Sequence, residues 1–250
     1  MQSEIVFSVC DAQIGYQTRK VTPGPEHDLV ADFIQNGLNG QGYSFRTGQL
    51  AVFVEPRIAS GFPDLVLAEF KPGFYERWTD ARNLLTSREL KMLSFLYSVN
   101  GADSKTIRKL MNETAADSQD SLELLFDAEL IDRDRSSRCW RPLPLDKTYG
   151  IKRLIAIEAK VCNNAEVLEQ ASLNRWFASE SYALTPTSPD SAFAARARRA
   201  GVGVVVAMGE RSYRQRLKPR QFGLPSSHAS WQFNEWIGRR LSCGGACNHG

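Results

Sequence analysis

Residues 154–161 read LIAIEAKV, an apolar run that carries a glutamate and a lysine two residues apart. Side chains alternate between the two faces of a β-strand, so Ala156, Glu158 and Lys160 share one face and aliphatic residues occupy the other. Two charges near the end of an apolar strand can lose their hydration and shift each other's pKa. The run by itself fits either a surface ion pair on an edge strand or a functional pair.

The length of 250 residues allows one large domain, or a domain and a small module. No apolar run approaches the roughly 20 residues that cross a bilayer, so no membrane association is expected. The early Glu4, without a basic stretch around it, predicts no secretion signal. The formal net charge of +3 is weak evidence for an acidic partner.

The cysteines indicate a reducing compartment. There are five, an odd number, and Cys10, Cys139 and Cys162 are scattered along the chain, which predicts reduced thiols in a cytoplasmic protein. The last residues, CGGACNHG, offer Cys243, Cys247 and His249 to a zinc ion. Because a fourth ligand is missing, a frayed terminus is the favoured interpretation.

Periodicity and turn residues predict the order of the elements. Start and stop signals favour a helix over 26–35, and two β-rich runs, 49–58 and 62–70, favour a hairpin across a Ser-Gly turn. Over 86–143, three helices precede a polar turn with short flanking strands, which resembles a winged-helix module. From 151 to 208 the chain alternates between strands and helices.

This order predicts an α/β fold with a mixed sheet flanked by helices. The corresponding domains are a discontinuous core of residues 1–85 and 146–250 and an inserted winged-helix module of residues 86–145.

Two motifs lie in the predicted core. Pro63 and Asp64 follow the hairpin turn, and Glu158 and Lys160 end the strand after the insertion. The order resembles the PD-(D/E)XK nuclease superfamily, which has a restriction-endonuclease-like fold. The resemblance covers about 26–82 and 150–208. It implies these catalytic residues: Asp64, Glu158, Lys160 and Gln170, the last in the helix after the strand.

Phosphodiester hydrolysis suits these residue types. Mg²⁺ or Mn²⁺ prefers carboxylate and water oxygens, and the expected ligands are Asp64, Glu158 and Glu26. Such an ion polarises the phosphate and lowers the pKa of bound water. Lys160 can orient or deprotonate that water and offset the charge that builds on the phosphate. Asp28 and Asp32 compete with Glu26 for the contact from the first helix.

Several of these residues also have ordinary structural explanations. Asp64 after proline is compatible with a turn residue, and Gln170 with a solvated helix residue. Glu55 is interpreted as an ordinary strand or edge residue, and His27 as a capping or surface group.

The segment 196–220 is the most basic part of the chain, with eight Lys or Arg residues and one acid, Glu210. Clustered arginines suit phosphate contacts, so this segment is predicted to bind nucleic acid. The predicted contacts are Arg196, Arg198, Arg199, Arg211, Arg214, Arg216 and Lys218.

The winged-helix segment gives a divided prediction. Its third helix is acidic and has no Lys or Arg from 114 to 132, so phosphates should repel it. The wing supplies the further predicted contacts Arg133, Arg135 and Arg138. The module therefore binds either the nucleic-acid backbone, through the wing and second helix, or a protein. An amphipathic helix that contains Trp231, Trp236 and Ile237 either packs on the core or forms a partner interface.

The sequence thus predicts a cytoplasmic, Mg²⁺- or Mn²⁺-dependent endodeoxyribonuclease, with DNA as the expected substrate and RNA as the open alternative. The resemblance implies one component of a larger defence, mobile-element or repair system, with a protein partner or a homodimer. The rival hypothesis is a non-catalytic nucleic-acid-binding or adaptor protein built on a degenerate nuclease fold.

Overall fold

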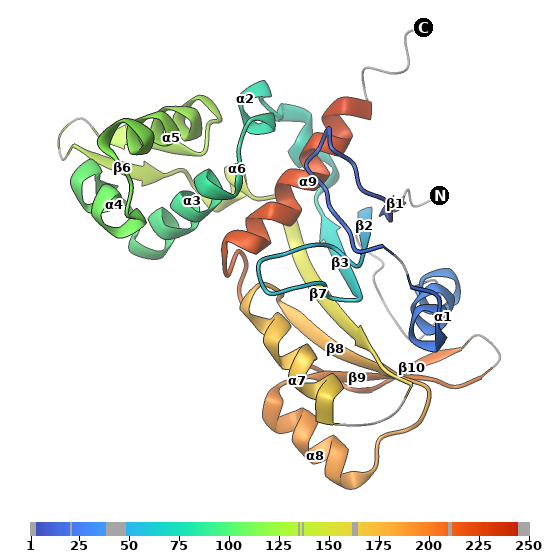
Figure 1. Ribbon diagram of the computed structural model, residues 1–250. Coiled ribbons are helices and arrows are strands. Elements are labelled where there is room, and N and C mark those ends of the chain that lie inside the picture. Colours follow the sequence, from blue (N-terminus) through green and yellow to red (C-terminus); the bar gives the residue numbers. More distant parts are fainter. Residues whose placement is uncertain are drawn as a thin grey trace, which may run out of the picture. The chain divides into compact units, whose positions relative to one another are not determined.

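The computed structural model describes residues 4–20, 22–38, 49–134, 136, 138–161, 165–209 and 212–244. The chain divides into two units, each of which is formed by two separate stretches of sequence. The first unit is Met1–Phe70 with Ile151–Leu224, and the second is Lys71–Gly150 with Pro225–Gly250. Figure 1 labels the helices and strands of both units.

Seven strands within the described residues of the first unit form a mixed sheet in the order β1-β2-β3-β7-β8-β9-β10. The strands are β1 (Glu4–Phe7), β2 (Gln49–Val54), β3 (Leu65–Phe70), β7 (Ile151–Ala159), β8 (Glu180–Thr185), β9 (Gly203–Ala207) and β10 (Tyr213–Leu217). β2 and β3 form the predicted hairpin, and β3 pairs antiparallel with β7. β7, β8 and β9 are parallel. The predicted α/β fold with a mixed sheet is confirmed, and β1 and β10 extend it at its two edges.

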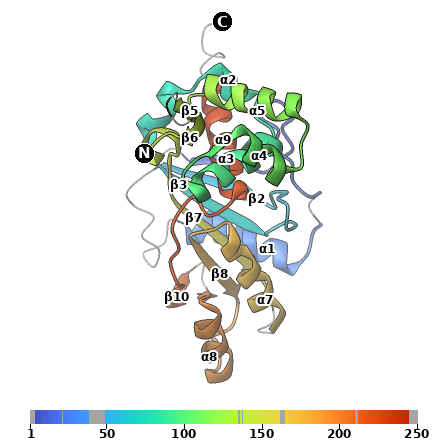
Figure 2. The ribbon, with the colours of Figure 1, turned by 90° about the vertical axis from the view of Figure 1, so that its left-hand side faces the viewer.

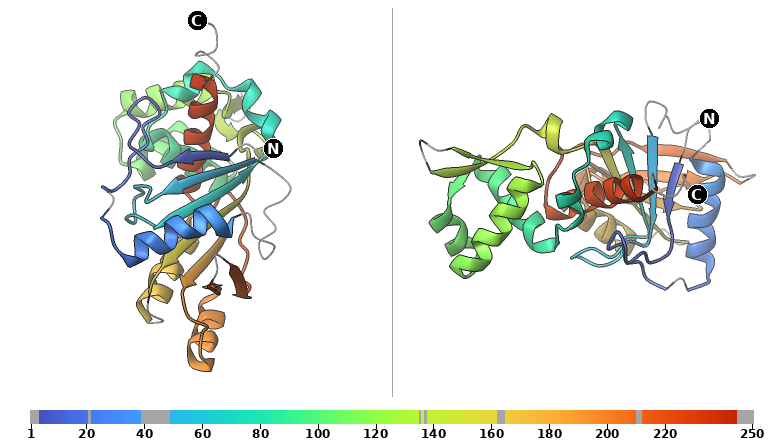
Figure 3. Two further views of the ribbon diagram at one scale, coloured as in Figure 1. Left: turned by 90° about the vertical axis from the view of Figure 1, so that its right-hand side faces the viewer. Right: turned by 90° about the horizontal axis from the view of Figure 1, so that it is seen from above.

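Helices cover both faces of this sheet. They are α1 (Pro25–Asp32) with the π-helical turn Phe33–Gly37, α7 (Ala165–Leu173) with the 3-10 turn Asn174–Trp176, and α8 (Ser191–Ala200). α1 contacts β7 and lies across the strands (Figure 3). α7 contacts β7, β8 and α8 (Figure 2). α1 starts as predicted, because Pro25 occupies its first turn together with two acidic residues.

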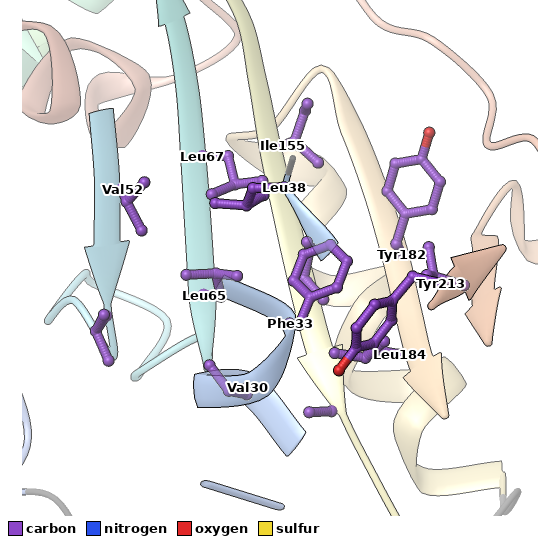
Figure 4. Packing of buried hydrophobic residues seen from close by; sticks show 14 of the residues in the cluster. Val30, Phe33, Leu38, Val52, Leu65, Leu67, Ile155, Tyr182, Leu184 and Tyr213 are labelled. Carbon is purple, nitrogen blue, oxygen red and sulfur yellow. The ribbon is translucent and has the colours of Figure 1, made fainter. Parts of the chain in front are cut away.

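Strand alternation assigns the side chains of β7 to two cores. Ile155 and Ile157 face α1, where they pack with Phe33 and Tyr182 in the cluster shown in Figure 4. On the other face, α7 and α8 pack on residues of β8 and β9, with Phe193 as the largest buried side chain. Each fully buried aliphatic or aromatic side chain stabilises the fold by about 1.5–3 kcal/mol. The even-numbered residues of β7, Glu158 among them, belong to the α7 face.

In the second unit, the described part of 86–143 contains three helices and a three-stranded antiparallel sheet of order β4-β6-β5. The elements are α3 (Ser87–Val99), β4 (Ala102–Asp103), α4 (Ser104–Met111), α5 (Ala115–Asp127), β5 (Ile131–Asp134) and β6 (Cys139–Pro142). The helices start at the capping side chains of Thr86, Asp103 and Thr114. The three helices and two short strands predicted for this segment are therefore present.

The second unit also includes residues that the prediction placed in the core. They form the 3-10 helix η2 (Pro72–Arg77), α2 (Asp80–Asn83), α6 (Leu145–Thr148) and α9 (His228–Gly244). Trp231 of α9 is buried against Tyr97 of α3 and against Tyr149. The unit therefore extends beyond the predicted 86–145 module, because the aromatic residues of α9 pack inside it.

A buried ion pair anchors α9 as well. Arg82 of α2 donates to Glu235, with 2.5 Å between Nη2 and Oε1. Trp236 and Ile237 of α9 are both among the buried apolar residues of the chain. Across the residues that the structure describes, no helix has both the length and the apolarity needed to cross a membrane.

Candidate active site

The register of β3 and β7 places two acids opposite each other. Leu65 pairs with Ile157, so Asp64 and Glu158 are the next residues across the antiparallel ladder. Their carboxyl groups are hydrogen-bonded to each other. Oδ2 of Asp64 also accepts a hydrogen bond from the backbone N–H of Ala159 at 2.8 Å. The two predicted motifs therefore meet at one end of the two strands.

Burial dominates the electrostatics of this pair. Glu158 is 6% exposed, and burial together with the neighbouring charge of Asp64 raises its pKa to about 8. Burial also raises the pKa of Asp64, although the hydrogen bond from Ala159 opposes the shift. The Glu158 carboxyl also has a neutral partner, since Nδ2 of Asn174 donates a hydrogen bond to Oε1 of Glu158 at 2.6 Å. At neutral pH the two acids therefore share a proton as a coupled pair.

Lys160 follows the end of β7, where its backbone N–H donates to the carbonyl of Leu184 at 3.0 Å. Its Nζ donates to Oε2 of Glu26 at 3.1 Å and lies 3.9 Å from Oε1 of Glu166. Burial lowers the pKa of Lys160, but the hydrogen bond to Glu26 and the two nearby carboxylates raise it above its usual value. The Lys160 side chain therefore stays protonated at neutral pH. This favours a role in stabilising negative charge over a role in abstracting a proton.

Two predicted residues do not contact the acid pair. Glu26, at the start of α1, forms the ion pair with Lys160. Gln170 is half-buried on α7, and the contact with Glu158 comes from Asn174, about one helical turn further along the chain. A second amide side chain four residues after Gln170 is the sequence signal that could have identified Asn174.

A third acid, Glu55, directly follows β2, at a position for which the sequence predicts an ordinary strand or edge residue. Val54 pairs with Leu65, so Glu55 lies across from Asp64, and its backbone N–H donates to the Asp64 carbonyl at 3.0 Å. Glu55 is buried and has a φ of 45°, a left-handed conformation that costs a non-glycine residue about 1–3 kcal/mol. Such strain in a buried acid, beside the other two, indicates a functional position.

Arg19 neutralises this third acid. Its Nε donates to Oε2 of Glu55 at 2.6 Å, and its Nη2 lies 3.9 Å from Oδ1 of Asp64. Arg19 lies before α1, and no spacing in the sequence connects it to either motif.

The donor set fits a hard divalent cation with open coordination positions. No group of three or more Asp, Glu, His or Cys side chains converges as metal ligands among the described residues. Mg²⁺, however, is commonly held by one or two carboxylates, with waters and substrate phosphate oxygens completing its shell. Asp64 and Glu158 supply two carboxyl groups, and the proton that they share is what a cation would replace.

The described basic side chains that were predicted to bind nucleic acid occur in three groups. Arg196, Arg198 and Arg199 are exposed on α8, whereas Arg214, Arg216 and Lys218 are exposed on β10 and just after it. Arg133 and Arg138 belong to the β5–β6 wing of the second unit, where Arg133 lies 5.4 Å from the ring centroid of Trp140. The acids of α5 are exposed. Arg135 and Arg211 lie outside the described residues.

The chain matches no protein-family model, and comparisons with curated proteins and with solved structures likewise found no match. The candidate site is therefore defined by its own geometry. That geometry is a hydrogen-bonded pair of carboxyl groups, the buried Glu158 and the half-buried Asp64, with a cationic lysine two residues beyond the first and an arginine beside the second.

Proposed function

We propose that this protein is a metal-dependent nuclease of the PD-(D/E)XK type that hydrolyses phosphodiester bonds in DNA. The observation that carries the proposal is the contact between Asp64 and Glu158 across β3 and β7, with Lys160 two residues further along. Two adjacent carboxyl groups, one of them buried, oppose folding unless a proton or a cation lies between them, and this arrangement favours a role in binding a cation.

Each residue of the site has a specific role in this proposal. Asp64 and Glu158 would hold Mg²⁺ or Mn²⁺, which supplies a polarised phosphate and a water of lowered pKa when it is bound. Lys160 keeps its positive charge and stabilises the negative charge that develops on the phosphate. Asn174 fixes one oxygen of Glu158 by its hydrogen bond, so that the other oxygen is directed toward Asp64.

The exposed cations support a nucleic-acid substrate. Arg214 and Arg216 project from the edge strand β10, and α8 adds three further arginines. Such clusters bind the phosphate backbone without reading its sequence. We further propose that the three helices and small sheet of the second unit form a winged helix, whose acidic α5 leaves the wing or a protein partner as the contact. Membership of a multi-component system and homodimer formation remain expectations from the family resemblance.

One observation favours a second candidate function. Nζ of Lys160 is bonded to Glu26, and the described residues hold no three-ligand group. A non-catalytic nucleic-acid-binding scaffold would retain this ion pair as a structural contact. The two candidate functions differ in whether the acid pair binds a metal.

The direct test is incubation of the purified protein with single-stranded DNA, duplex DNA and RNA in Mg²⁺, Mn²⁺ or EDTA. Lys160→Ala is compared with Lys152→Ala, a matched change at an exposed lysine of β7. The nuclease proposal expects metal-dependent cleavage that falls by about 100-fold or more in Lys160→Ala and persists in Lys152→Ala.

A negative cleavage assay still separates the two candidates. Mn²⁺ binding, measured by calorimetry, should be lost in Asp64→Asn if the acid pair is a metal site. Binding without cleavage indicates an enzyme that lacks its substrate or its partner. If the wild type binds no Mn²⁺ at this pair, the scaffold is the correct interpretation.

A further inference from the structure

The segment before α1 is bound along the end of β2. The Tyr16 hydroxyl donates to the carbonyl of Val54 at 2.9 Å, and Oγ1 of Thr18 donates to the same carbonyl at 2.8 Å. The backbone N–H of Arg19 donates to the carbonyl of Glu55 at 3.2 Å. These contacts fix the backbone of Arg19 beside the acids, so its side chain starts from a defined position.

The anchoring of this segment does not depend on the Arg19 side chain. On the far side of Glu55, the backbone N–H of Arg57 donates to the carbonyl of Gln17 at 2.9 Å. Nη1 of Arg57 also donates to Oε1 of Gln17 at 2.9 Å. The Arg19 guanidinium can therefore change partners while the backbone beneath it stays bound.

The guanidinium is placed to reach a ligand of the acid pair. Arg19 has half of its side chain exposed, whereas the Glu55 side chain to which it donates is 9% exposed. One N–H of its fork bonds Glu55, and Nη2 lies 3.9 Å from Asp64. A guanidinium carries five N–H donors, and pairs of them match the two oxygens of a phosphate group.

Charge balance explains why Arg19 would change partners. In the free protein Arg19 neutralises Glu55, the strained acid beside Asp64. A divalent cation on Asp64 and Glu158 would repel the guanidinium, and an incoming phosphodiester would attract it. Arginine rather than lysine suits such a transfer, because its planar fork remains charged and can bind two oxygens at once.

We propose that Arg19 is a phosphate-contacting residue that rests on Glu55 in the free protein and transfers to the substrate phosphate when nucleic acid binds. This inference rests on the proposed function and adds a substrate contact that lies outside both sequence motifs. Glu55 then binds the Arg19 side chain while no substrate is present, and its left-handed backbone directs its carboxylate toward Arg19.

The test compares Arg19→Gln with Lys20→Gln, which removes the same charge from the neighbouring exposed residue. Affinity for a labelled duplex is measured by fluorescence anisotropy over a series of salt concentrations. Arg19→Gln should lower affinity about 5- to 10-fold and reduce the salt slope by about 1, whereas Lys20→Gln should change affinity less than about 2-fold. Single-turnover cleavage in Mg²⁺ should fall about 100-fold in Arg19→Gln alone.

Mn²⁺ binding without DNA separates a substrate contact from a structural role. Arg19→Gln removes the guanidinium cation that lies near the acid pair, so Mn²⁺ affinity should stay unchanged or rise. Damage to the site would instead lower the Mn²⁺ affinity. Arg19→Lys, which keeps the charge, should recover part of the DNA affinity but little of the cleavage rate. The inference is overturned if Arg19→Gln and Lys20→Gln behave alike, or if Mn²⁺ binding and DNA binding fall together.

Failure of this inference is distinguishable from failure of the proposed function. If the wild type cleaves DNA and Arg19→Gln cleaves equally well, the nuclease stands and the arginine contact does not. If the wild type never cleaves, the salt slope still reports whether Arg19 contacts a phosphate, and a slope equal to that of Lys20→Gln rejects the contact.

Discussion

Glu158 and Glu180 are both buried in the sheet of the first unit, but their partners have opposite charge. Glu180 accepts two hydrogen bonds from Arg153, at 2.9 and 3.0 Å. Glu158 instead contacts the carboxyl group of Asp64. The first arrangement stabilises a folded chain, whereas the second opposes folding unless a proton or a cation intervenes.

The same conservative change should therefore have opposite effects at the two positions. In Glu158→Gln the amide can donate to Asp64 and still accept from Asn174, so we expect the free energy of unfolding to rise by about 1–3 kcal/mol. Glu180→Gln should lower it by about 2–4 kcal/mol, because Arg153 loses the nearer of two acidic partners and keeps Glu69, at 3.7 Å. Urea denaturation of both variants measures the difference.

Metal binding is the companion measurement for Glu158→Gln. The variant should lose Mn²⁺ binding, since the amide is a poorer ligand and cannot release a proton. A Glu158→Gln protein that is both destabilised and still able to bind Mn²⁺ would show that the acid pair is structural.

The residues predicted from the sequence were those that belong to local motifs. Asp64 after a turn and Glu158 near the end of an apolar strand are visible without a fold, because strand alternation fixes their faces. Glu55 and Arg19 could not be found in this way. Glu55 joins the site through the β2–β3 register and its left-handed φ, and Arg19 through hydrogen bonds of the preceding segment.

At the scale of the elements, the start of α3 is held by a complete capping box. Thr86 caps the helix, and the Glu89 carboxylate accepts hydrogen bonds from the Thr86 backbone N–H at 2.8 Å and from the Ser121 hydroxyl at 2.7 Å. Burial alone would raise the pKa of Glu89, but these hydrogen bonds outweigh it and hold the pKa below the ordinary 4.5. The ionised carboxylate therefore stabilises the fold.

This cap should make stability depend on pH in one direction. A carboxyl whose pKa is lowered by folding contributes fully above its unfolded pKa and loses the contribution as pH falls through the folded value. Glu89→Gln should thus be less stable than the wild type by about 1 kcal/mol at pH 7, and the difference should shrink as the pH falls through the lowered pKa of Glu89. Tryptophan fluorescence suits the measurement, since four of the five tryptophans lie in the second unit. A difference that persists unchanged at low pH would contradict the role of the charge.

The edge strand β10 gives the test of the nucleic-acid surface. If Arg214 and Arg216 contact phosphates, replacing both with Gln should reduce the salt slope of DNA binding by about 2. The matched comparison is the pair Arg133 and Arg138 on the wing of the second unit. Equal losses would assign both units to the substrate, whereas an effect of the wing pair alone would remove β10 from the interface.

The two edge strands show where element prediction from sequence stops. β1 is a four-residue strand, too short for its alternation to be distinguished from chance. In β10, Tyr213, Gln215 and Leu217 alternate with long cations, and the arginines made the segment resemble a basic loop. β10 is a strand because it pairs with the apolar β9. The residue pattern of a single segment does not reveal such a partner.

For the whole molecule, the division into two units makes a prediction about truncation. A chain that ends after Leu224 lacks α9 and therefore the partners of Arg82, Tyr97 and Tyr149. Hydrogen exchange should show that amides of α3 lose protection, because the core of the second unit loses Trp231. Amides of β3 and β7 should keep theirs. Equal loss in β7 would show that the two units unfold as one.

The order of segments along the chain has a consequence for synthesis on the ribosome. β3 cannot pair with β7 until β7 emerges, which happens only after the 80 residues of Lys71–Gly150. The stretch Lys71–Gly150 in turn lacks a packing partner until α9 has been made, and α9 is the last helix that the structure describes. Each unit is therefore completed only after a stretch of the other unit has been made, although domains commonly fold one after another from the N-terminus. Asp64 and Glu158, 94 residues apart, therefore cannot meet until β7 has been made, so a site that needs both acids forms only after the intervening stretch has been synthesised.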